Sequence, residues 1–222
     1  MEGRMIEFKG NGETYSGYLS APPNVAPGLI VIQEYWGLVD HIMDVSDRFA
    51  ATGFAALSPD LYKGKKTKSP DEAGKMFMAL NIVEAEKILR GAIDALLANP
   101  ACNSKTVGVV GFCMGGQLAL YAAAVNPDKV SACVDYYGTH PNVHPPLEKL
   151  NAPVLGFFGE RDHSVNPNQL KQQLTAAGKP HEFHFYKADH AFFNDARPEV
   201  YNTEAAHDTW QRMLAFFRQH VK

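Results

Sequence analysis

A cysteine flanked by glycines, in Gly111-Phe-Cys113-Met-Gly115, is the part of the sequence best suited to covalent chemistry. An apolar run that predicts a strand (107–112) precedes it, and an Ala- and Leu-rich run that predicts a helix (115–124) follows it. A nucleophile in such a tight strand-to-helix turn needs glycine neighbours, because side chains there would collide with the strand and the helix. The helix N-terminus would stabilise a thiolate at Cys113, and the N–H of Met114 would point to where an oxyanion forms. The alternative is a buried structural cysteine.

A carboxylate and a histidine follow this cysteine in the order that a catalytic triad requires. A predicted strand (154–158) leads into Gly-x-x-Asp162, and the last predicted strand leads into the loop that holds His190. In folds with a nucleophile at a strand-to-helix turn, the acid and then the base follow later in the chain. We choose Asp162 over Glu160 because Gly-x-x-Asp is the usual placement of the acid; the alternative for Asp162 is a carboxylate that caps its loop. We therefore expect Cys113, Asp162 and His190 to form a triad.

The other conspicuous histidines do not predict a metal site. His181 and His184 lie three residues apart on a predicted strand, so their side chains would point to opposite faces. His140 and His144 flank a proline-rich loop and lack a third ligand. We interpret all four as neutral surface imidazoles and expect no metal and no cofactor.

Composition and charge argue against several classes of function. The 222 residues are 45% hydrophobic and 20% charged, which is ordinary for a globular protein. The net charge is -3 and the basic residues are scattered, so we expect no nucleic-acid partner. The exception is a cluster of four lysines within residues 63–68, which we interpret as a solvated loop. No run approaches the ~18 apolar residues of a membrane helix, so we expect no membrane partner either.

Cysteine usage and the N-terminal residues indicate a reducing compartment. The three cysteines, Cys102, Cys113 and Cys133, are an odd number and form no paired framework. Residues 1–7 contain no apolar run and no small-residue cleavage site, so we expect no secretory signal. Together these features predict a cytoplasmic protein with free thiols. The length suits one domain spanning residues 1–222, and we expect a monomer or weak homodimer that acts on a small molecule.

Hydrophobic runs alternate with helical periodicity from residue 29 to the C-terminus, which predicts an α/β protein. The alternation implies right-handed crossovers and a mostly parallel sheet of about seven to eight strands, covered by helices on both faces. Two earlier strands, joined by a Gly-Asn-Gly turn, are expected to be antiparallel. The predicted strands are 5–8, 14–19, 29–33, 54–57, 107–112, 130–134, 154–158 and 183–186. The predicted helices are 42–51, 71–98 with a candidate break at Asn81, 115–124, 167–177 and 203–218.

Six motifs carry a resemblance that runs nearly from end to end. They are Gln33-Glu34-Tyr35-Trp36-Gly37, Ser58-Pro-Asp-Leu-Tyr62, Gly111-Phe-Cys-Met-Gly-Gly116, Asp135-Tyr-Tyr-Gly138, Gly159-x-x-Asp162 and His190-x-Phe192. With these motifs the chain resembles the dienelactone hydrolase (carboxymethylenebutenolidase) family of α/β-hydrolases. The resemblance implies the same triad at positions 113, 162 and 190. It also implies that Glu34 contacts the thiol and that the backbone N–H of Tyr35 is the second oxyanion donor.

A carboxylate beside the thiol has a physical rationale. Glu34 could accept the thiol proton when substrate arrives, so that the thiolate exists only in the occupied site and is exposed less to oxidation. The alternative for Glu34 is a loop carboxylate that faces solvent.

The resemblance is weaker where the family binds its substrate. Members that hydrolyse dienelactone carry a serine directly after the histidine and an arginine four residues after it, where this chain has Ala191 and Asn194. A second arginine is expected near residues 70–78, and that stretch offers only Lys75. If residues 191–196 form a helical turn, Arg197 shares a face with position 194 and could hold a carboxylate. Against this, the proline at 198 disfavours helical geometry, and a solvent-exposed Arg197 is the alternative. The candidate substrate-binding residues are Arg197, Trp36 and Lys75.

The choice of sulfur as the nucleophile narrows the reaction. A tetrahedral intermediate that holds a thiolate and a plain alkoxide tends to expel the thiolate, which regenerates the substrate. Progress is favoured when the other group leaves easily too, as an enolate or phenolate does. We therefore expect a hydrolase of enol lactones or activated esters. The alternatives are a thioesterase, a general carboxylesterase or a peptidase on the same scaffold, and a non-catalytic member that only binds a ligand.

Overall fold

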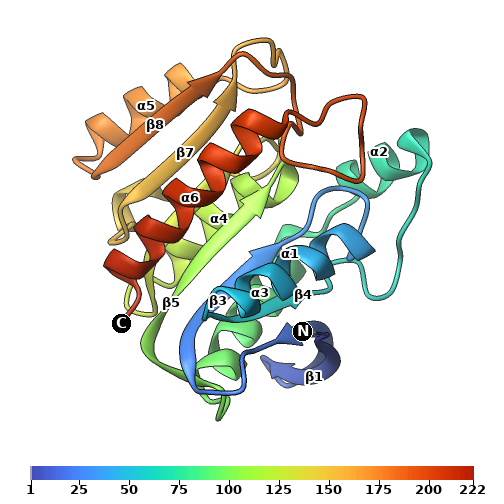
Figure 1. Ribbon diagram of the computed structural model, residues 1–222, viewed down its shortest axis with the longest axis vertical. Helices are drawn as coiled ribbons and strands as arrows, with labels where there is room; N and C mark the ends of the chain where they lie inside the picture. Colours follow the sequence, from blue (N-terminus) through green and yellow to red (C-terminus); the bar gives the residue numbers. More distant parts are fainter. Residues whose placement is uncertain (1) are drawn as a thin grey trace.

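An eight-stranded sheet forms the centre of the computed structural model, which describes residues 2–222 (Figure 1). The strand order is β1-β2-β4-β3-β5-β6-β7-β8. β1 pairs antiparallel with β2, and β2 with β4, whereas all the other neighbours are parallel. The strands are β1 (Arg4–Gly10), β2 (Glu13–Ser20), β3 (Ala26–Ile32), β4 (Ala55–Pro59), β5 (Cys102–Phe112), β6 (Val130–Tyr136), β7 (Val154–Gly159) and β8 (His181–Tyr186). The predicted mostly parallel sheet is therefore confirmed.

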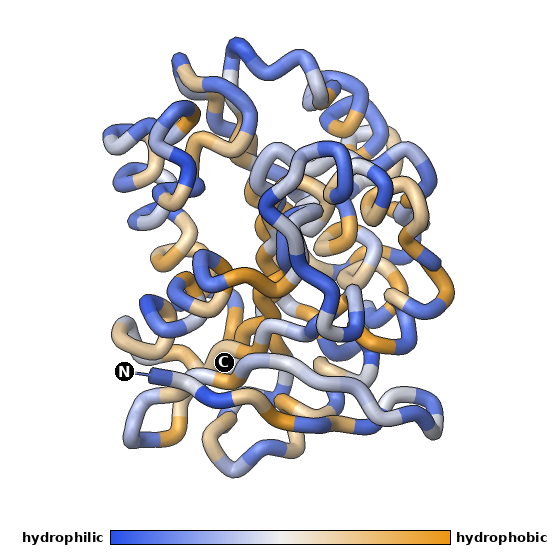
Figure 2. Tube along the Cα trace, turned by 90° about the vertical axis from the view of Figure 1, so that its right-hand side faces the viewer, coloured by the Kyte–Doolittle hydropathy of each residue, from blue (hydrophilic) through white to orange (hydrophobic). Residues whose placement is uncertain are grey.

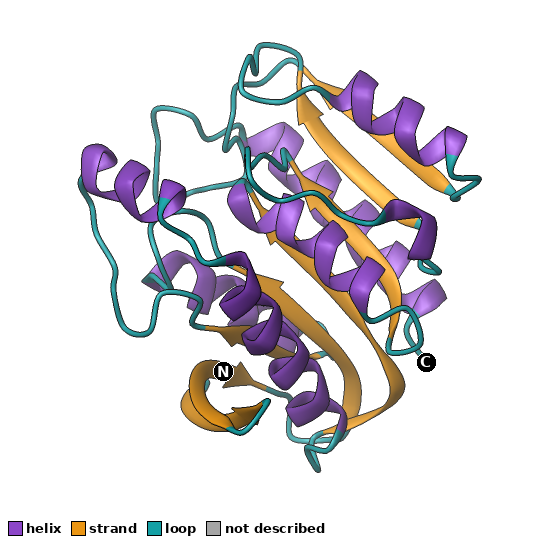
Figure 3. Cartoon of the chain, turned by 180° about the vertical axis from the view of Figure 1, so that it is seen from behind, coloured by secondary structure: helices purple, strands orange, loops and turns teal. Residues whose placement is uncertain are grey.

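Helices cover both faces of this sheet. α1 (Asp40–Ala51) and α6 (Thr203–His220) lie in front of it in Figure 1, where the Phe49 ring of α1 contacts the Trp210 ring of α6 at a centroid distance of 4.7 Å. α3 (Ile82–Leu97) and α4 (Met114–Val125) pack on the opposite face, which is turned toward the viewer in Figure 3. The remaining helices are α2 (Pro70–Met78), α5 (Pro167–Ala176) and a short 3-10 helix, η1 (Leu147–Lys149).

The central strands are buried along most of their length because helices cover both of their faces. Leu29 to Ile32 in β3 and Val109 to Phe112 in β5 are buried throughout, and Figure 2 shows hydrophobic segments gathered in the interior of the molecule. Strands of this kind appear in a sequence as continuous apolar runs, which is why these two could be recognised. Within residues 2–222, no helix is both long enough and apolar enough to cross a membrane.

Two element boundaries illustrate what local sequence does and does not reveal. The predicted break at Asn81 is confirmed: α2 ends at Met78, and the Asn81 side chain caps α3 by accepting a hydrogen bond from the Glu84 N–H (3.1 Å). By contrast, β5 begins at Cys102 rather than at residue 107. Its first residues are polar and partly exposed, so no apolar run marks them, although Cys102 pairs with β3.

The parallel strands bring distant loops together at one edge of the sheet. The carboxyl ends of β3, β5, β7 and β8 all open toward the same side, and Figure 1 shows the loop after β8 beside the loop after β3. In open α/β sheets, this edge is where ligands bind. The four loops that carry the candidate catalytic residues therefore meet.

We expect the packing of α6 on β5 to be sensitive to a single methyl group. A Cβ at Gly108 would lie 2.6 Å from the Phe217 ring and 2.7 Å from Leu29, both of them buried. Gly108→Ala should therefore lower the free energy of unfolding by about 1–3 kcal/mol through overpacking. Urea denaturation of the variant and the wild type measures this difference.

Gly74 in α2 is the matched control, because a Cβ there has no neighbour within 4 Å. Gly74→Ala should be neutral or raise stability by up to about 1 kcal/mol through better helix propensity. Equal midpoints of urea denaturation for Gly108→Ala and the wild type would contradict the close packing of Phe217 and Leu29 around Gly108.

Candidate active site

Cys113 lies at the junction of β5 and α4 in a backbone conformation that side chains rarely adopt, with φ 56° and ψ -119°. Backbone hydrogen bonds hold it there: its N–H donates to the carbonyl of Tyr136 (3.0 Å), and its own carbonyl accepts from Gly116 (2.9 Å) and Thr139 (3.2 Å). Such conformations cost about 1–3 kcal/mol and persist only where the surroundings enforce them. The strand-to-helix turn predicted from the glycine pattern is present.

The two flanking glycines are required by backbone contacts. A Cβ at Gly111 would lie 1.8 Å from the carbonyl oxygen of Gly115, and a Cβ at Gly115 would lie 2.4 Å from that of Ile32. Neither neighbour is a flexible side chain that could give way. The Gly-x-Cys-x-Gly pattern is thus a packing requirement of the turn between β5 and α4.

His190 and Asp162 form a short hydrogen bond, with His190 Nδ1 2.6 Å from Asp162 Oδ2. The Asp162 side chain is fully covered, and its other oxygen accepts from the Ser164 N–H at 2.8 Å. Burial alone would raise the pKa of Asp162, but the hydrogen bond to His190 and the His190 charge outweigh burial and lower it. Glu160, the rejected alternative, is exposed.

Cys113 lies on the other side of the same imidazole. Burial by itself lowers the pKa of His190, but hydrogen bonds to Asp162 and to Cys113, together with the charges of both groups, raise it to about 10. A protonated imidazole next to the sulfur would stabilise a thiolate once the thiol proton has left. The structure brings together the three residues that the sequence assigned to a triad.

A surface ion pair joins the two loops that carry Asp162 and His190. Arg161 Nε and Nη2 donate to the two oxygens of Asp189 at 3.0 and 2.7 Å, and Arg161 Nη1 donates to the Lys187 carbonyl. Each partner of this pair directly neighbours a triad residue in the sequence. Sequence reasoning missed this clamp; the available signal was an opposite-charge pair in two loops already expected to meet.

Glu34 is buried, so the alternative of a solvent-facing carboxylate is wrong. Its Oε2 accepts a hydrogen bond from Asn194 Nδ2 at 2.7 Å, while its Oε1 is enclosed without a partner among the described residues. Burial raises the pKa of Glu34, although the charge of His41 and the hydrogen bond from Asn194 lower it in part. Sequence reasoning had treated Asn194 only as a missing arginine, and the structure assigns it to holding Glu34.

The loop that follows Glu34 is fixed by the lysine-rich segment. Gly37 has φ 95°, and a Cβ there would lie 2.4 Å from the Lys65 carbonyl oxygen, so the two backbones pack in direct contact. The Thr67 N–H donates to the Trp36 carbonyl at 3.0 Å. This packing determines where the backbone N–H of Tyr35 lies. Met114, the other candidate oxyanion donor, is the first residue of α4, where N–H groups have no acceptor within the helix.

Arg197 and Trp36 line one cavity, and Lys75 does not. Two successive turns lead to Arg197: the Asn194 N–H donates to the Ala191 carbonyl, and the Arg197 N–H donates to the Asn194 carbonyl. The Arg197 guanidinium carbon lies 5.5 Å from the centre of the Trp36 ring. Its Nε also donates to Glu199 (2.8 Å). Lys75 is exposed on α2. The cavity measures about 690 Å³, and its charged or ionisable lining residues are His41, Asp40, Lys66, Lys68, Arg197 and Glu199.

The interpretation of the lysine cluster as a solvated loop is confirmed, because all four lysines are exposed, and the structure adds a contact with the first cavity. Lys66 and Lys68 are exposed, but they form part of the cavity wall, because the contact at Gly37 places their segment against the Trp36 loop. Lys63, by contrast, pairs with Glu84 and is not part of this cavity lining.

The interpretation of His140 as a surface imidazole is wrong as well. His140 is buried; its Nε2 lies 2.9 Å from the Phe77 carbonyl oxygen, and its Nδ1 accepts from the Asn142 N–H. It therefore joins α2 to the loop after β6. Within residues 2–222, no three His, Cys, Asp or Glu side chains gather as metal ligands.

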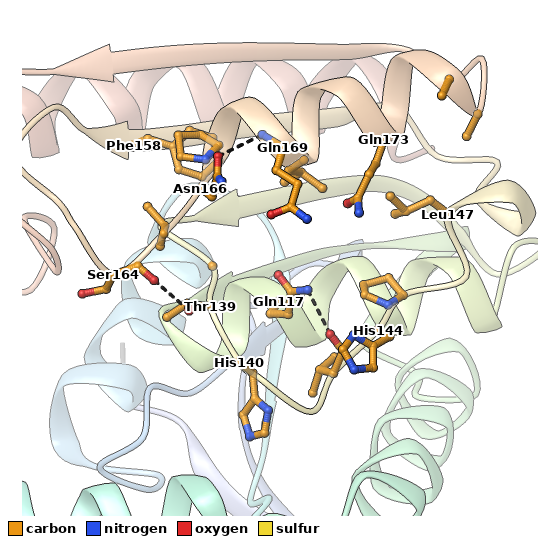
Figure 4. Close-up of a pocket in the computed structure, with 18 of the residues that line it drawn as sticks. Gln117, Thr139, His140, His144, Leu147, Phe158, Ser164, Asn166, Gln169 and Gln173 are labelled. Atoms are coloured by element: carbon orange, nitrogen blue, oxygen red, sulfur yellow. Dashed lines mark hydrogen bonds between the residues drawn. The ribbon is translucent and has the colours of Figure 1, made fainter.

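A second cavity of about 710 Å³ lies between α4, α5 and the loop after β6 (Figure 4). Figure 4 shows Gln169 and Gln173 of α5 facing Gln117 of α4 across it. It adjoins the acid loop, because the Thr139 hydroxyl in its wall donates to the Ser164 carbonyl at 3.0 Å. Cys113 and His190 are not among the lining residues of either cavity.

Comparison with known proteins agrees with this fold. The model of the dienelactone hydrolase family matches residues 15–221. Protein usf of Aquifex pyrophilus is 34% identical, with 99% of each chain covered, and a protein of Aquifex aeolicus named "Putative carboxymethylenebutenolidase" is 30% identical, with 99% of this chain and 100% of that one covered. Among solved structures, a "Putative Dienelactone Hydrolase" from Klebsiella pneumoniae has a TM-score of 0.85 and 31% identity, covering 98% and 99% of the two chains. The chain belongs to the dienelactone hydrolase family of α/β-hydrolase-fold enzymes.

Proposed function

We propose that this hydrolase cleaves an ester or lactone through a covalent intermediate on Cys113, with His190 and Asp162 completing the triad. The observation that carries the proposal is the 2.6 Å hydrogen bond between His190 and Asp162, formed beside a cysteine in a strained strand-to-helix turn. A nucleophile, a base and a group that orients the base are the components that acyl transfer requires.

The proposed mechanism has two halves. The Cys113 thiolate attacks the carbonyl carbon, and the N–H groups of Met114 and Tyr35 stabilise the oxyanion that forms. The intermediate then collapses, and His190, as an imidazolium oriented by Asp162, protonates the leaving oxygen. In the second half, neutral His190 takes a proton from water, which attacks the thioester and releases the acid. We assign to Glu34 the role of accepting the thiol proton when substrate arrives and of returning it to the Cys113 thiolate when the acid is released.

We propose enol lactones and activated esters as the substrates, for two reasons. A thiolate is expelled from the tetrahedral intermediate more readily than a simple alkoxide, so the reaction proceeds when the other group is an enolate or a phenolate. In addition, relatives at 30–32% identity carry the name "Putative carboxymethylenebutenolidase". A thioesterase is the second candidate, and comparing p-nitrophenyl esters, acyl-CoA and peptides as substrates separates the two.

We further propose a cytoplasmic protein, monomeric or weakly dimeric, that acts on a small molecule without nucleic acid, membrane, metal or cofactor. Three cysteines without a disulfide among them support a reducing compartment. The proposed chemistry needs only side chains and backbone N–H groups of this chain.

Iodoacetamide should alkylate Cys113 before the other cysteines, with hydrolysis lost in step. Cys133 is fully buried, and burial raises its pKa well above the usual range, so it should stay unmodified. Cys102 is half-buried, with its Sγ 3.5 Å from the Ser104 hydroxyl, and should react more slowly than Cys113. Mass-spectrometric mapping at increasing times tests this order. Complete modification of Cys113 with hydrolysis retained would rule it out as the nucleophile.

Asp162→Asn should keep the fold but misorient His190, lowering kcat by about 10²–10⁴-fold. Glu160→Gln is the matched control: that residue is exposed and two positions away, and its replacement should cost less than about tenfold. Steady-state kinetics with a p-nitrophenyl ester measure both effects. The opposite ranking would show that Glu160 is the acid.

Arg197→Ala should selectively weaken turnover of substrates that carry a carboxylate. The guanidinium lines the cavity beside Trp36, but part of it faces solvent and it already pairs with Glu199. We therefore expect kcat/KM for the charged substrate to fall by an amount that corresponds to about 1.5 kcal/mol, the lower end of the range for a charge-assisted hydrogen bond. The measurement compares a charged lactone with its neutral ester analogue.

Lys75→Ala is the control for Arg197→Ala, because Lys75 carries the same charge on an exposed helix outside the cavity lining. It should change neither substrate's kcat/KM. Equal small effects of Arg197→Ala on both substrates would mean that the cavity prefers an uncharged group.

A further inference from the structure

Strained backbone is concentrated around the proposed triad. Among residues 2–222, the residues other than glycine with a positive φ are Asn11, Lys63, Cys113, Tyr137 and Ala191. The first two lie in exposed turns, whereas Ala191 directly follows His190. A positive φ is unfavourable for a bulky side chain, and such conformations gather at functional sites. Tyr137, with φ 42°, therefore calls for an explanation, and the proposed mechanism gives it no role.

The Tyr137 ring packs against the imidazole of His190. The two ring centres are 5.0 Å apart and their planes are inclined by 59°, and Tyr137 is fully buried. The hydrogen bond from His190 Nδ1 to Asp162 fixes the distance of one ring nitrogen, but it leaves the imidazole free to turn about that bond. A buried aromatic ring beside the imidazole restricts this rotation.

The positive φ at Tyr137 explains how two successive tyrosines come to contact the same residue. Tyr136 is the last residue of β6, and its ring centre lies 6.3 Å from that of Phe192. The Tyr137 ring centre lies 5.3 Å from the same phenylalanine, which is two residues after His190. Successive side chains of an extended strand point to opposite faces. The change in backbone conformation therefore lets the Tyr137 ring, too, lie against the loop that holds His190.

The residues around Tyr137 also hold the nucleophile. The Tyr136 carbonyl accepts from the Cys113 N–H at 3.0 Å, and the Thr139 N–H donates to the Cys113 carbonyl at 3.2 Å. The Tyr137 N–H donates to the Phe157 carbonyl on β7 at 2.9 Å, which fixes this segment to the sheet. One short turn thus contacts Cys113 through its backbone and His190 through a side chain.

We propose that Tyr137 is a positioning residue, whose ring holds the His190 imidazole so that residues 136–139 set the base relative to the sulfur of Cys113. The ring carries this role, because the Tyr137 hydroxyl is enclosed without a hydrogen-bond partner among the described residues. Phenylalanine at position 137 keeps the contact, whereas leucine leaves the imidazole room to turn. The consequence for hydrolysis rests on the proposed function, but the contact with His190 does not.

The direct test follows the titration of His190 by ¹⁵N NMR in protein labelled at histidine, where its resonances are those missing from His190→Gln. Hydrogen bonds to Asp162 and Cys113 raise the pKa of His190, and an imidazole that turns away loses them. In Tyr137→Leu the titration should therefore move to lower pH, by about one pH unit or more. Tyr137→Phe should titrate as the wild type does, and Asp162→Asn is the positive control for the shift. An unchanged titration in Tyr137→Leu, or an equal shift in Tyr137→Phe, would overturn the proposal.

A shift in Tyr137→Leu would not come from a lost charge. The charged and ionisable groups that act on or face His190 are Asp162, Cys113, Glu34 and Tyr137 itself. Burial raises the pKa of Tyr137 well above its usual range, so the phenol stays neutral while His190 titrates. The other three groups remain in the variant.

Phe183→Leu is the matched control. The Phe183 ring packs against His181 at 5.5 Å and 61°, nearly the geometry of the Tyr137–His190 contact, but on β8 outside the site. Its replacement should leave the His190 titration unchanged, and an equal shift would show a general loosening that contradicts a specific contact. Urea denaturation verifies that each variant is folded. If Tyr137→Leu does not fold, Tyr137→Met replaces it, because methionine fills the space with a flexible side chain.

The second test is steady-state kinetics with an activated ester. Tyr137→Leu should lower kcat by about 10–100-fold, because a small displacement of the base misaligns the proton transfer. KM should stay nearly unchanged, since Tyr137 is buried and lines neither cavity, and Tyr137→Phe should keep the wild-type kcat. A raised KM with unchanged kcat would assign Tyr137 to substrate binding and overturn the proposal. If the wild type hydrolyses no ester, the proposed function fails, while the NMR titration still decides whether Tyr137 holds His190.

Discussion

The left-handed backbone at Cys113 is the constraint on which the surrounding structure depends. A residue with φ 56° between a strand and a helix leaves no room for side chains on either side, which explains Gly111 and Gly115. The same turn is held from outside by the Tyr136 carbonyl and the Thr139 N–H, so β6 and the loop after it must end where they do. The strained conformation persists because the buried end of β5 and the first turn of α4 hold the backbone before and after Cys113.

The remaining parts of the site are positioned by the parallel sheet. Asp162 and His190 follow the last two strands and Glu34 follows β3, so their loops leave the same edge. The Arg161–Asp189 pair then joins the loop that holds Asp162 to the loop that holds His190. Exposed ion pairs contribute little to stability, about 0–1 kcal/mol. The value of this pair lies in fixing the two loops relative to each other.

The sheet and the convergence of Cys113, Asp162 and His190 could be predicted from the sequence because both depend on local patterns. Buried parallel strands are continuous apolar runs, and the glycines around Cys113 mark a steric requirement of a single turn. The contacts that were missed join residues far apart in the chain, such as Glu34 with Asn194 and His41 with Asp195. No periodicity in either segment encodes such a contact. His140 was misjudged for the same reason, because its partner is a backbone carbonyl on α2 that no side-chain pattern reveals.

The contact between Gly37 and the lysine-rich segment has a consequence for thermal behaviour. The Trp36 loop and residues 65–67 are joined by backbone packing and by the Thr67–Trp36 hydrogen bond, so we expect the two segments to open together. Exposed segments of this kind open locally at free energies well below that of global unfolding. Each such opening would carry the Tyr35 N–H away from the reaction centre while the sheet stays folded. The temperature at which activity declines would then be set by this surface segment, and a protein with an intact core would already be inactive.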